Sequence, residues 1–207
     1  MLHGENILLL NKVQNQQAKA KSLGKISTKE QTALDVMKNY IEKTNKMMKL
    51  FDVPLHYNFF KASISNGEFD MSKIFEDTLV EQCPEMAVTF VDNHDTEPGQ
   101  SLESWVLDWF KPLAYSLILL REEGFPCVFY GDYYGIPSQN INPIKDKLEN
   151  LMVLRRDYAY GEQIDYFDHH NIIAWVRTGD DEHPNSGLVT IMSDGPGGGK
   201  TINVGSR

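Results

Sequence analysis

The stretch Val88-Thr89-Phe90-Val91-Asp92-Asn93-His94-Asp95 decides the fold of this chain. A short β-branched and aromatic run, typical of a strand buried on both faces, ends abruptly in four polar residues. Open α/β sheets and βα-barrels carry their chemistry at the carboxyl ends of parallel strands, because the loops there have no scaffold role. The stretch therefore predicts either a functional site or a polar loop in which Asn93 and Asp95 make turn hydrogen bonds.

The sequence before this stretch predicts one helix and a second strand. Leu34, Met37 and Ile41 are spaced three and four apart, which gives one apolar helical face. Residues 50–54 follow as a short strand that a proline stops. Residues 14–25, rich in Gln, Asn, Ala and Lys, carry no strand signal and predict a solvated helix or a disordered arm.

The sequence after Asp95 continues the alternation of helix and strand. Ser101 is a candidate N-cap, which would place Trp105 and Trp109 four apart on one helix as core anchors. Pro112 then opens a further helix, since proline fits the first helical position. Residues 127–130 follow as another buried strand, and a helix begins at Pro143. Strand and helix in this rhythm indicate parallel βα units.

Beyond residue 160 the pattern changes to short strands with turns between them. Strands are predicted over residues 164–167, 172–177, 188–192 and 201–204, and no helix is available to cross between them. This is typical of an antiparallel sheet, because parallel strands need long crossover connections.

Composition limits the classes of function. The chain has 207 residues, enough for a substantial core. Its net charge of −9 argues against nucleic-acid and anionic-membrane partners, since neither phosphate surface attracts an acidic protein. We see no membrane span and no export signal in the chain as given, which leaves the compartment undecided. Cys83 and Cys127 have no metal-type spacing and are interpreted as free thiols.

Several segments in the correct order resemble the α-amylase family of retaining glycoside hydrolases, in particular its liquefying bacterial members. Residues 90–95 resemble the family's fourth sequence region, which ends the seventh barrel strand. Residues 51–57 are similar to the sixth-strand segment. Residues 98–103, 109–115 and 128–132 are similar to the seventh helix and the eighth strand.

The resemblance implies an α/β fold class: a partial (β/α)8 TIM barrel, comprising its last strands and helices, followed by an antiparallel β C-terminal domain. Residues 1–33 would be a poorly matched N-terminal arm, 34–160 the C-terminal part of the catalytic barrel, and 161–207 a truncated C-terminal domain. A complete barrel needs about 250 residues. The chain is therefore expected to be a C-terminal fragment.

The resemblance also implies a role for the strand-end residues. Retaining glycosidases use a nucleophile and a general acid about 5 Å apart. The family adds a third carboxylate that stabilises the transition state, and Asp95 matches it. His94 and Asn93 match substrate-binding positions, where His94 would bond to sugar hydroxyls and Asn93 would support the loop. Glu97 stands where the family usually has Gln.

The nucleophile and the general acid are expected to be absent. The nucleophile belongs to a barrel strand that the chain does not contain. The acid should lie near Thr28, where no matching motif occurs. Glu30 and Glu5 are interpreted as ordinary surface carboxylates.

A calcium ion is also implied by the resemblance, between the barrel and the C-terminal domain. Backbone oxygens and carboxylates suit this hard cation. The alternative is a pair of turns and a Gly-rich hairpin without metal. Asn171 stands where the family often has Asp, which lowers the expected affinity. The matching positions are Gly67, Phe69, His170, Asn171 and Asp194.

The implied function is hydrolysis of α-1,4-glucan, such as starch or glycogen, in a piece that is inactive alone. The complete protein is expected to be a monomer with an α-glucan partner. A non-catalytic carbohydrate-binding or interaction remnant is the alternative, and a chain without function is a third. Tyr130, Tyr133 and Tyr134 could stack on sugar rings, but packing is the favoured interpretation.

Overall fold

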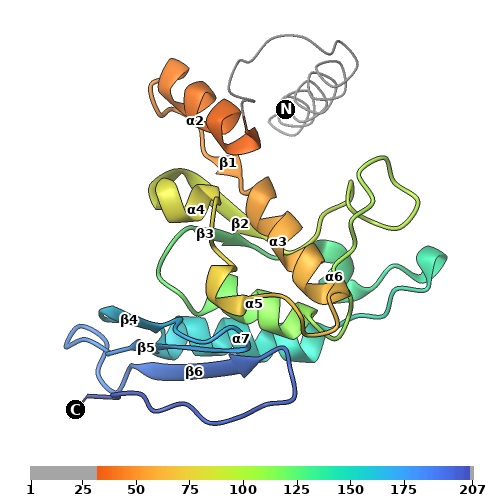
Figure 1. Ribbon diagram of the computed structural model, residues 1–207. Helices are drawn as coiled ribbons and strands as arrows, with labels where there is room; N and C mark the ends of the chain where they lie inside the picture. Colours follow the sequence, from red (N-terminus) through yellow and green to blue (C-terminus); the bar gives the residue numbers. More distant parts are fainter. Residues whose placement is uncertain (1–31, 206–207) are drawn as a thin grey trace.

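Two small sheets organise the computed structural model, which describes residues 32–205 (Figure 1). Strands β1 (Leu50–Phe51), β2 (Ala87–Phe90) and β3 (Phe125–Cys127) form a parallel sheet in the order β1-β2-β3. The prediction that the central strand is flanked in parallel by the strands before and after it is confirmed. Each crossover between these strands contains a helix, as a parallel pair requires.

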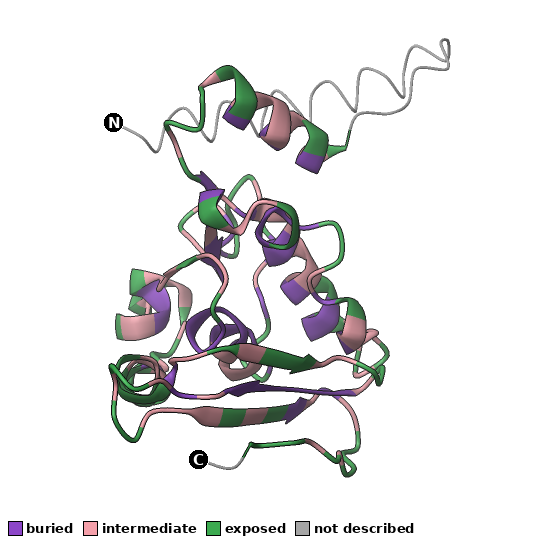
Figure 2. Ribbon diagram, turned by 90° about the vertical axis from the view of Figure 1, so that its left-hand side faces the viewer, coloured by how far each residue is buried: buried purple, intermediate pink, exposed green. Residues whose placement is uncertain are grey.

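The second sheet is antiparallel and follows the parallel sheet in the chain. It consists of β4 (Gln163–Tyr166), β5 (Ile172–Arg177) and β6 (Leu188–Ser193), with β5 in the centre. Every residue of β5 is buried, whereas β4 and β6 keep exposed positions (Figure 2). The change from parallel to antiparallel pairing near residue 160 agrees with the sequence pattern, and the division into domains stays a prediction.

Helices connect and cover these sheets. In Figures 1 and 2, α5 and α7 lie against one face of the antiparallel sheet. No helix among residues 32–205 is long and apolar enough to cross a bilayer. The helices are α2 (Ala33–Lys43), α3 (Val53–Ile64), α4 (Leu79–Gln82), α5 (Lys111–Leu119), α6 (Tyr130–Tyr134) and α7 (Lys145–Tyr158), with 3-10 turns at Met71–Lys73, Pro84–Met86 and Pro137–Gln139.

Local chemistry sets where α2 and α3 begin. Thr32 and Asp35 form a reciprocal capping box at the start of α2. Asp52 caps α3 by accepting from Leu55 N at 3.1 Å, and Pro54 occupies the first turn. The predicted strand over residues 50–54 is therefore too long, because this cap begins a helix directly after Phe51.

Three further predicted elements are wrong. Residues 101–109 contain no helix, because their backbone instead bonds to the strand-end loop: Ser104 N donates to Thr96 O at 3.1 Å. The strand predicted over residues 127–130 ends at Cys127, and Tyr130 begins α6. Residues 201–204 form no ladder; side-chain bonds such as that from Asn203 N to the Tyr166 hydroxyl hold them instead.

The junction of the two sheets is packed and charged. Trp175 of β5 is fully buried and donates its indole N–H to Leu120 O at 3.4 Å. Arg121 forms a bidentate pair with Asp165, at 2.6 and 2.8 Å, and its guanidinium lies over the rings of Phe75 and Phe167. Such a fork-to-fork pair fixes orientation as well as distance. The antiparallel sheet is therefore held firmly against the helical part.

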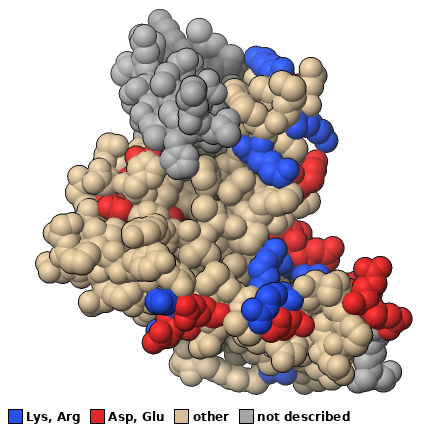
Figure 3. Space-filling view, turned by 180° about the vertical axis from the view of Figure 1, so that it is seen from behind, with Lys and Arg blue, Asp and Glu red and all other residues tan. Residues whose placement is uncertain are grey.

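Charged side chains of both signs intermingle over the lower part of the face in Figure 3. A hollow of about 610 Å³ lies at the sheet junction and includes Thr89, Arg121 and Phe167 in its lining. None of its lining residues belongs to the strand-end loop after β2. This hollow thus lies apart from the polar residues that the sequence singles out.

Candidate functional site

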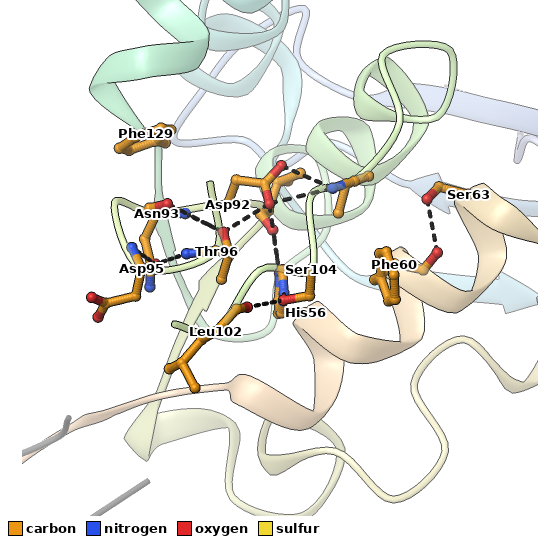
Figure 4. A network of polar contacts seen from close by, with 12 residues as sticks. His56, Phe60, Ser63, Asp92, Asn93, Asp95, Thr96, Leu102, Ser104 and Phe129 are labelled. Carbon is orange, nitrogen blue, oxygen red and sulfur yellow. Dashed lines mark hydrogen bonds and ion pairs between the residues drawn. The ribbon is translucent and has the colours of Figure 1, made fainter. Parts of the chain in front are cut away.

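The loop after β2 is built around Asn93. Its side-chain Oδ1 accepts from Asp95 N at 2.8 Å and from Thr96 N at 3.2 Å, which closes an Asx turn (Figure 4). The Thr96 hydroxyl in turn accepts from Asn93 N at 3.0 Å. Asn93 thus supports the loop, as expected, and a contact between Asn93 and substrate stays a prediction.

Asp95 and His94 occupy the outer side of this loop. The His94 side chain is 52% exposed and the Asp95 side chain 23% exposed, and His94 Nε2 lies 3.6 Å from Asp95 Oδ1. In Figure 4 the Asp95 carboxylate points away from the buried polar contacts behind it. An accessible carboxylate beside an imidazole is able to accept and donate hydrogen bonds to a polyhydroxylated ligand.

Asp92, three residues earlier, has the opposite environment. It is fully buried and accepts from Lys111 Nζ at 2.7 Å and from the Thr96 hydroxyl at 2.9 Å. Burial raises the pKa of Asp92 to about 7, although the Lys111 ammonium opposes this shift. Of the two carboxylates in the loop, Asp92 is therefore bonded within the interior, and Asp95 is partly exposed to solvent.

Lys111 joins the loop to the next βα unit. Its ammonium also contacts Asp132 of α6, and the Tyr115 hydroxyl donates to the other oxygen of Asp132 at 2.6 Å. The ammonium lies 3.2 Å from the centre of the Trp105 ring. Asp132 is thus a buried structural carboxylate within α6, the short helix that follows β3.

His56 of α3 supports the loop from the other side. Its ring stacks on Phe90 with centroids 5.2 Å apart, and Nδ1 lies 2.6 Å from Val91 O. Because a carbonyl only accepts, Nδ1 carries the proton. Burial lowers the pKa of His56 to about 4, which favours the neutral ring, and Nε2 lies 2.8 Å from the Ser104 hydroxyl, which in turn lies 2.8 Å from Leu102 O.

The sequence interpretation missed three of these buried polar residues: His56, Lys111 and Tyr115. One signal was available for Lys111. It stands at the start of a helix between Phe110 and Pro112, where the helix dipole and apolar neighbours both disfavour a cation. A lysine in that position indicates a buried carboxylate partner. No comparable signal exists for His56, whose partners come from two distant segments.

The residues proposed for calcium also converge, at the sheet junction. Asn171 Nδ2 donates to Gly67 O at 3.1 Å, and a Cβ on Gly67 would lie 2.8 Å from Asp194 O. His170 O accepts from Met71 N at 2.6 Å, which places this carbonyl at the same junction. The structure gives no polar contact for the Phe69 carbonyl, so its role stays a prediction.

Unpartnered oxygens mark this junction as suited to a cation. Both carboxylate oxygens of Asp194 and Oδ1 of Asn171 are buried without any hydrogen-bond donor. Burial raises the pKa of Asp194 to about 6. Buried oxygens in proteins are nearly always paired, and a hard cation with oxygen ligands would satisfy these. No three His, Cys, Asp or Glu side chains of residues 32–205 gather as a metal-binding group. Most of the proposed calcium ligands are instead backbone carbonyl oxygens and the side-chain amide oxygen of Asn171.

The residues invoked for the general acid cannot be placed. Glu5, Thr28 and Glu30 lie outside the part of the chain that the structure describes. The interpretation of Glu5 and Glu30 as ordinary surface carboxylates, and the expected lack of a general acid near Thr28, stay predictions.

The fold and the strand-end loop define a class: an α/β protein whose accessible polar residues follow a parallel strand, with an antiparallel sheet after it. Solved structures of that class include AmyP in complex with maltose. AmyP matches with a TM-score of 0.51 at 15% identity, over 76% of this chain and 43% of that chain. A likeness at this identity concerns the fold alone.

Sequence comparison gives the family. No profile of a known protein family matches the chain. It is 58% identical over 174 residues to the α-amylase of Geobacillus stearothermophilus, a match that covers 84% of this chain and 32% of the relative. It is 45% identical to the cytoplasmic α-amylase of Escherichia coli K12, over 84% of this chain and 37% of that protein. The chain is a homologue of the α-amylase family and spans about a third of the length of these relatives.

Proposed function

We propose that this chain is the C-terminal part of the (β/α)8 barrel, with the following β-domain, of an α-amylase-type hydrolase that acts on α-1,4-glucan with retention. The observation that carries the proposal is the contrast between Asp92 and Asp95. Asp92 is held in the interior by Lys111, whereas Asp95 is accessible beside His94. A residue that binds sugar hydroxyls must be open to the ligand, and the partial exposure of the Asp95 side chain supports this role.

Asp95 would act as the third carboxylate of the retaining mechanism. In that role it stabilises positive charge at the anomeric carbon and accepts hydrogen bonds from ring hydroxyls. His94 would contact the same sugar. Asn93 would act through the backbone, because its Oδ1 holds the amide groups of Asp95 and Thr96.

The isolated chain should bind glucan and leave it intact. Forming and breaking the glycosyl-enzyme intermediate requires a nucleophile and an acid, and the proposed function assigns neither to this chain. We expect no reducing sugar to be released from soluble starch by the purified chain. Release that disappears in Asp95→Asn would overturn this assignment.

Binding tests the site itself. Isothermal titration with maltoheptaose should show weaker binding in Asp95→Asn and in His94→Ala than in the unaltered chain. Asp108→Asn is the matched control, because Asp108 is an exposed carboxylate close in sequence. If the chain binds and neither variant alters the affinity, the ligand sits elsewhere, which favours a non-catalytic binding role over the proposed one.

We further propose that Ca²⁺ binds where the two sheets meet. Asp194, Asn171 and the carbonyls of Gly67, Phe69 and His170 would hold the ion. The support is the set of buried oxygens without donors on Asp194 and Asn171. When bound, the ion would neutralise the Asp194 carboxylate and tie the loop after α3 to β5 and β6. Its contribution is structural, since this junction lies apart from Asp95.

A further inference from the structure

Tyr130 and Tyr134 form an exposed pair of rings on α6. They lie four residues apart on one helical face, with ring centroids 4.6 Å apart and planes tilted by 37°. Tyr130 is 70% exposed and Tyr134 57% exposed. The expectation that these two tyrosines pack in the interior is therefore wrong. Two large rings exposed side by side offer a continuous aromatic surface to a ligand.

Tyr133, the third tyrosine of the helix, has a different environment. Tyr133 is partly buried against the core, and its hydroxyl donates to Glu149 at 2.7 Å. The Lys145 ammonium lies 5.4 Å from the centre of its ring. Tyr130 and Tyr134 differ from it in exposing their ring surfaces.

The short helix that carries the pair is firmly fixed. Asp132, between the two rings in sequence, is buried against Lys111 and Tyr115. Its carbonyl accepts from Ile144 N at 2.8 Å. A side chain at Gly131 would collide with Phe129, because a Cβ there would lie 2.4 Å from that ring. Rings held on a fixed backbone lose little conformational freedom when a ligand stacks on them.

The pair is continuous with the loop that carries Asp95. Gln139, just beyond α6, donates to the Glu97 carboxylate at 2.8 Å. Phe129, just before α6, meets Trp105 of the same loop region edge to face, with ring centroids 6.5 Å apart. Both segments follow the carboxyl ends of neighbouring parallel strands, so they line the same end of the sheet.

We propose that Tyr130 and Tyr134 form a stacking platform for glucose rings of an α-glucan chain that extends from the Asp95 loop. The inference rests on the proposed function, since it takes the ligand to be α-glucan. Pyranose rings present apolar C–H faces edged with hydroxyls. Tyrosine matches this pattern, with an apolar ring surface and a hydroxyl at its edge. The platform would bind and orient the chain, and it takes no part in bond cleavage.

Isothermal titration of the full chain with maltoheptaose tests the platform. Tyr130→Ala and Tyr134→Ala should each raise the dissociation constant about five- to tenfold, as expected for the loss of one aromatic stacking contact. Tyr134→Trp should retain the affinity. Tyr158→Ala is the matched control, because Tyr158 is an exposed tyrosine on α7, 41% accessible, and should change nothing. Circular dichroism confirms that each variant is folded.

The outcomes separate this inference from the proposed function. If Asp95→Asn weakens binding and both tyrosine variants bind normally, the platform is wrong and the proposed function stands. If the unaltered chain binds no maltoheptaose, the proposed function fails and the platform with it. If both alanine variants lose affinity while Tyr134→Trp and Tyr158→Ala keep it, the platform is supported.

Discussion

Lys111 lets two carboxylates remain buried a short distance apart. Its ammonium contacts Asp92 and Asp132, and all three side chains are about 1% exposed or less. Without the ammonium, both carboxylates would lie in a low-dielectric environment with no opposite charge. The loop that presents Asp95 is thus tied to α6 through a single cation.

Replacing this cation should be costly. We expect Lys111→Met to lower the free energy of unfolding by about 3–5 kcal/mol, the usual cost of breaking a buried ion pair. Urea denaturation at pH 7 measures it. The control is Lys46→Ala, which removes an exposed pair with Glu85 and should change the free energy of unfolding far less. Adding Asp92→Asn to Lys111→Met should recover part of the lost stability. Equal losses in Lys111→Met and Lys46→Ala would contradict the buried ion pair.

His56 makes stability depend on pH. Its pKa is about 4 in the folded protein, against an ordinary value near 6.5, so the unfolded chain binds the extra proton more readily between these values. Stability from His56 is therefore present above pH 6.5 and is lost as the pH falls toward 4. The difference amounts to roughly 3 kcal/mol for a shift of this size.

A comparison with His56→Gln isolates this contribution. Asp92 has the opposite dependence, because its raised pKa means that stability falls as the pH rises toward 7. Subtracting the unfolding free energies of the two proteins at each pH removes the common contribution of Asp92. The advantage of the unaltered chain should shrink between pH 6.5 and pH 4. An advantage that stays constant over this interval would contradict the buried, neutral imidazole.

At the scale of elements, Asp52 is more than a helix cap. Its carboxylate accepts from Leu55 N, Leu79 N and Val80 N, at 3.1, 3.1 and 2.7 Å, and it is fully buried. One side chain thereby satisfies the first turns of α3 and α4 together. The two helices are positioned relative to each other by a residue that the sequence pattern assigned to a strand.

Asp52→Ala should therefore cost more than an ordinary cap. Removing an exposed cap typically costs about 1 kcal/mol, whereas buried amides left without acceptors cost about 1–3 kcal/mol each. We expect a loss of at least about 3 kcal/mol in thermal or urea unfolding. Thr32→Ala, which removes the exposed capping box of α2, is the comparison and should cost about 1 kcal/mol. Similar losses for both would show that the second helix does not depend on Asp52.

The sequence predicts most elements by type, and it fails where long-range contacts decide. Apolar periodicity predicts α2 and β5 well, since both depend on local pattern and burial. The predicted helix over residues 101–109 is wrong because Val106 N and Ser104 bond to partners that periodicity cannot reveal: Asp92, Thr96 and His56. Within the candidate site, Asp95 and His94 follow from motif resemblance. The buried network beneath them depends on segments that come together only in the fold.

For the molecule as a whole, calcium should act at the junction of the sheets. A ligand that binds only the folded state raises stability by mass action. Millimolar Ca²⁺ should therefore raise the melting temperature, and Mg²⁺ at the same ionic strength should do so less, because it demands a smaller octahedral site. Asp194→Ala should abolish the calcium shift. Asp168→Ala is the control, since Asp168 is an exposed carboxylate near the junction.

An unchanged melting temperature, or a calcium shift that persists in Asp194→Ala, would rule out this site. Loss of the shift in Asp168→Ala alone would place the ion elsewhere on the junction.

The order β1-β2-β3 is also the order of synthesis, and so is β4-β5-β6. Each strand pairs only with the strand immediately before or after it in the chain, so no ladder joins strands that are distant in strand order. The bond from Asn171 to Gly67 instead spans 104 residues. Because closing long loops is slow relative to pairing neighbours, we expect the antiparallel ladders, in which Tyr166 pairs with Ala174, to form before the parallel ladder that pairs Leu50 with Ala87. Pulse-labelled hydrogen exchange should then show amides of β5 protected before those of β1 and β2.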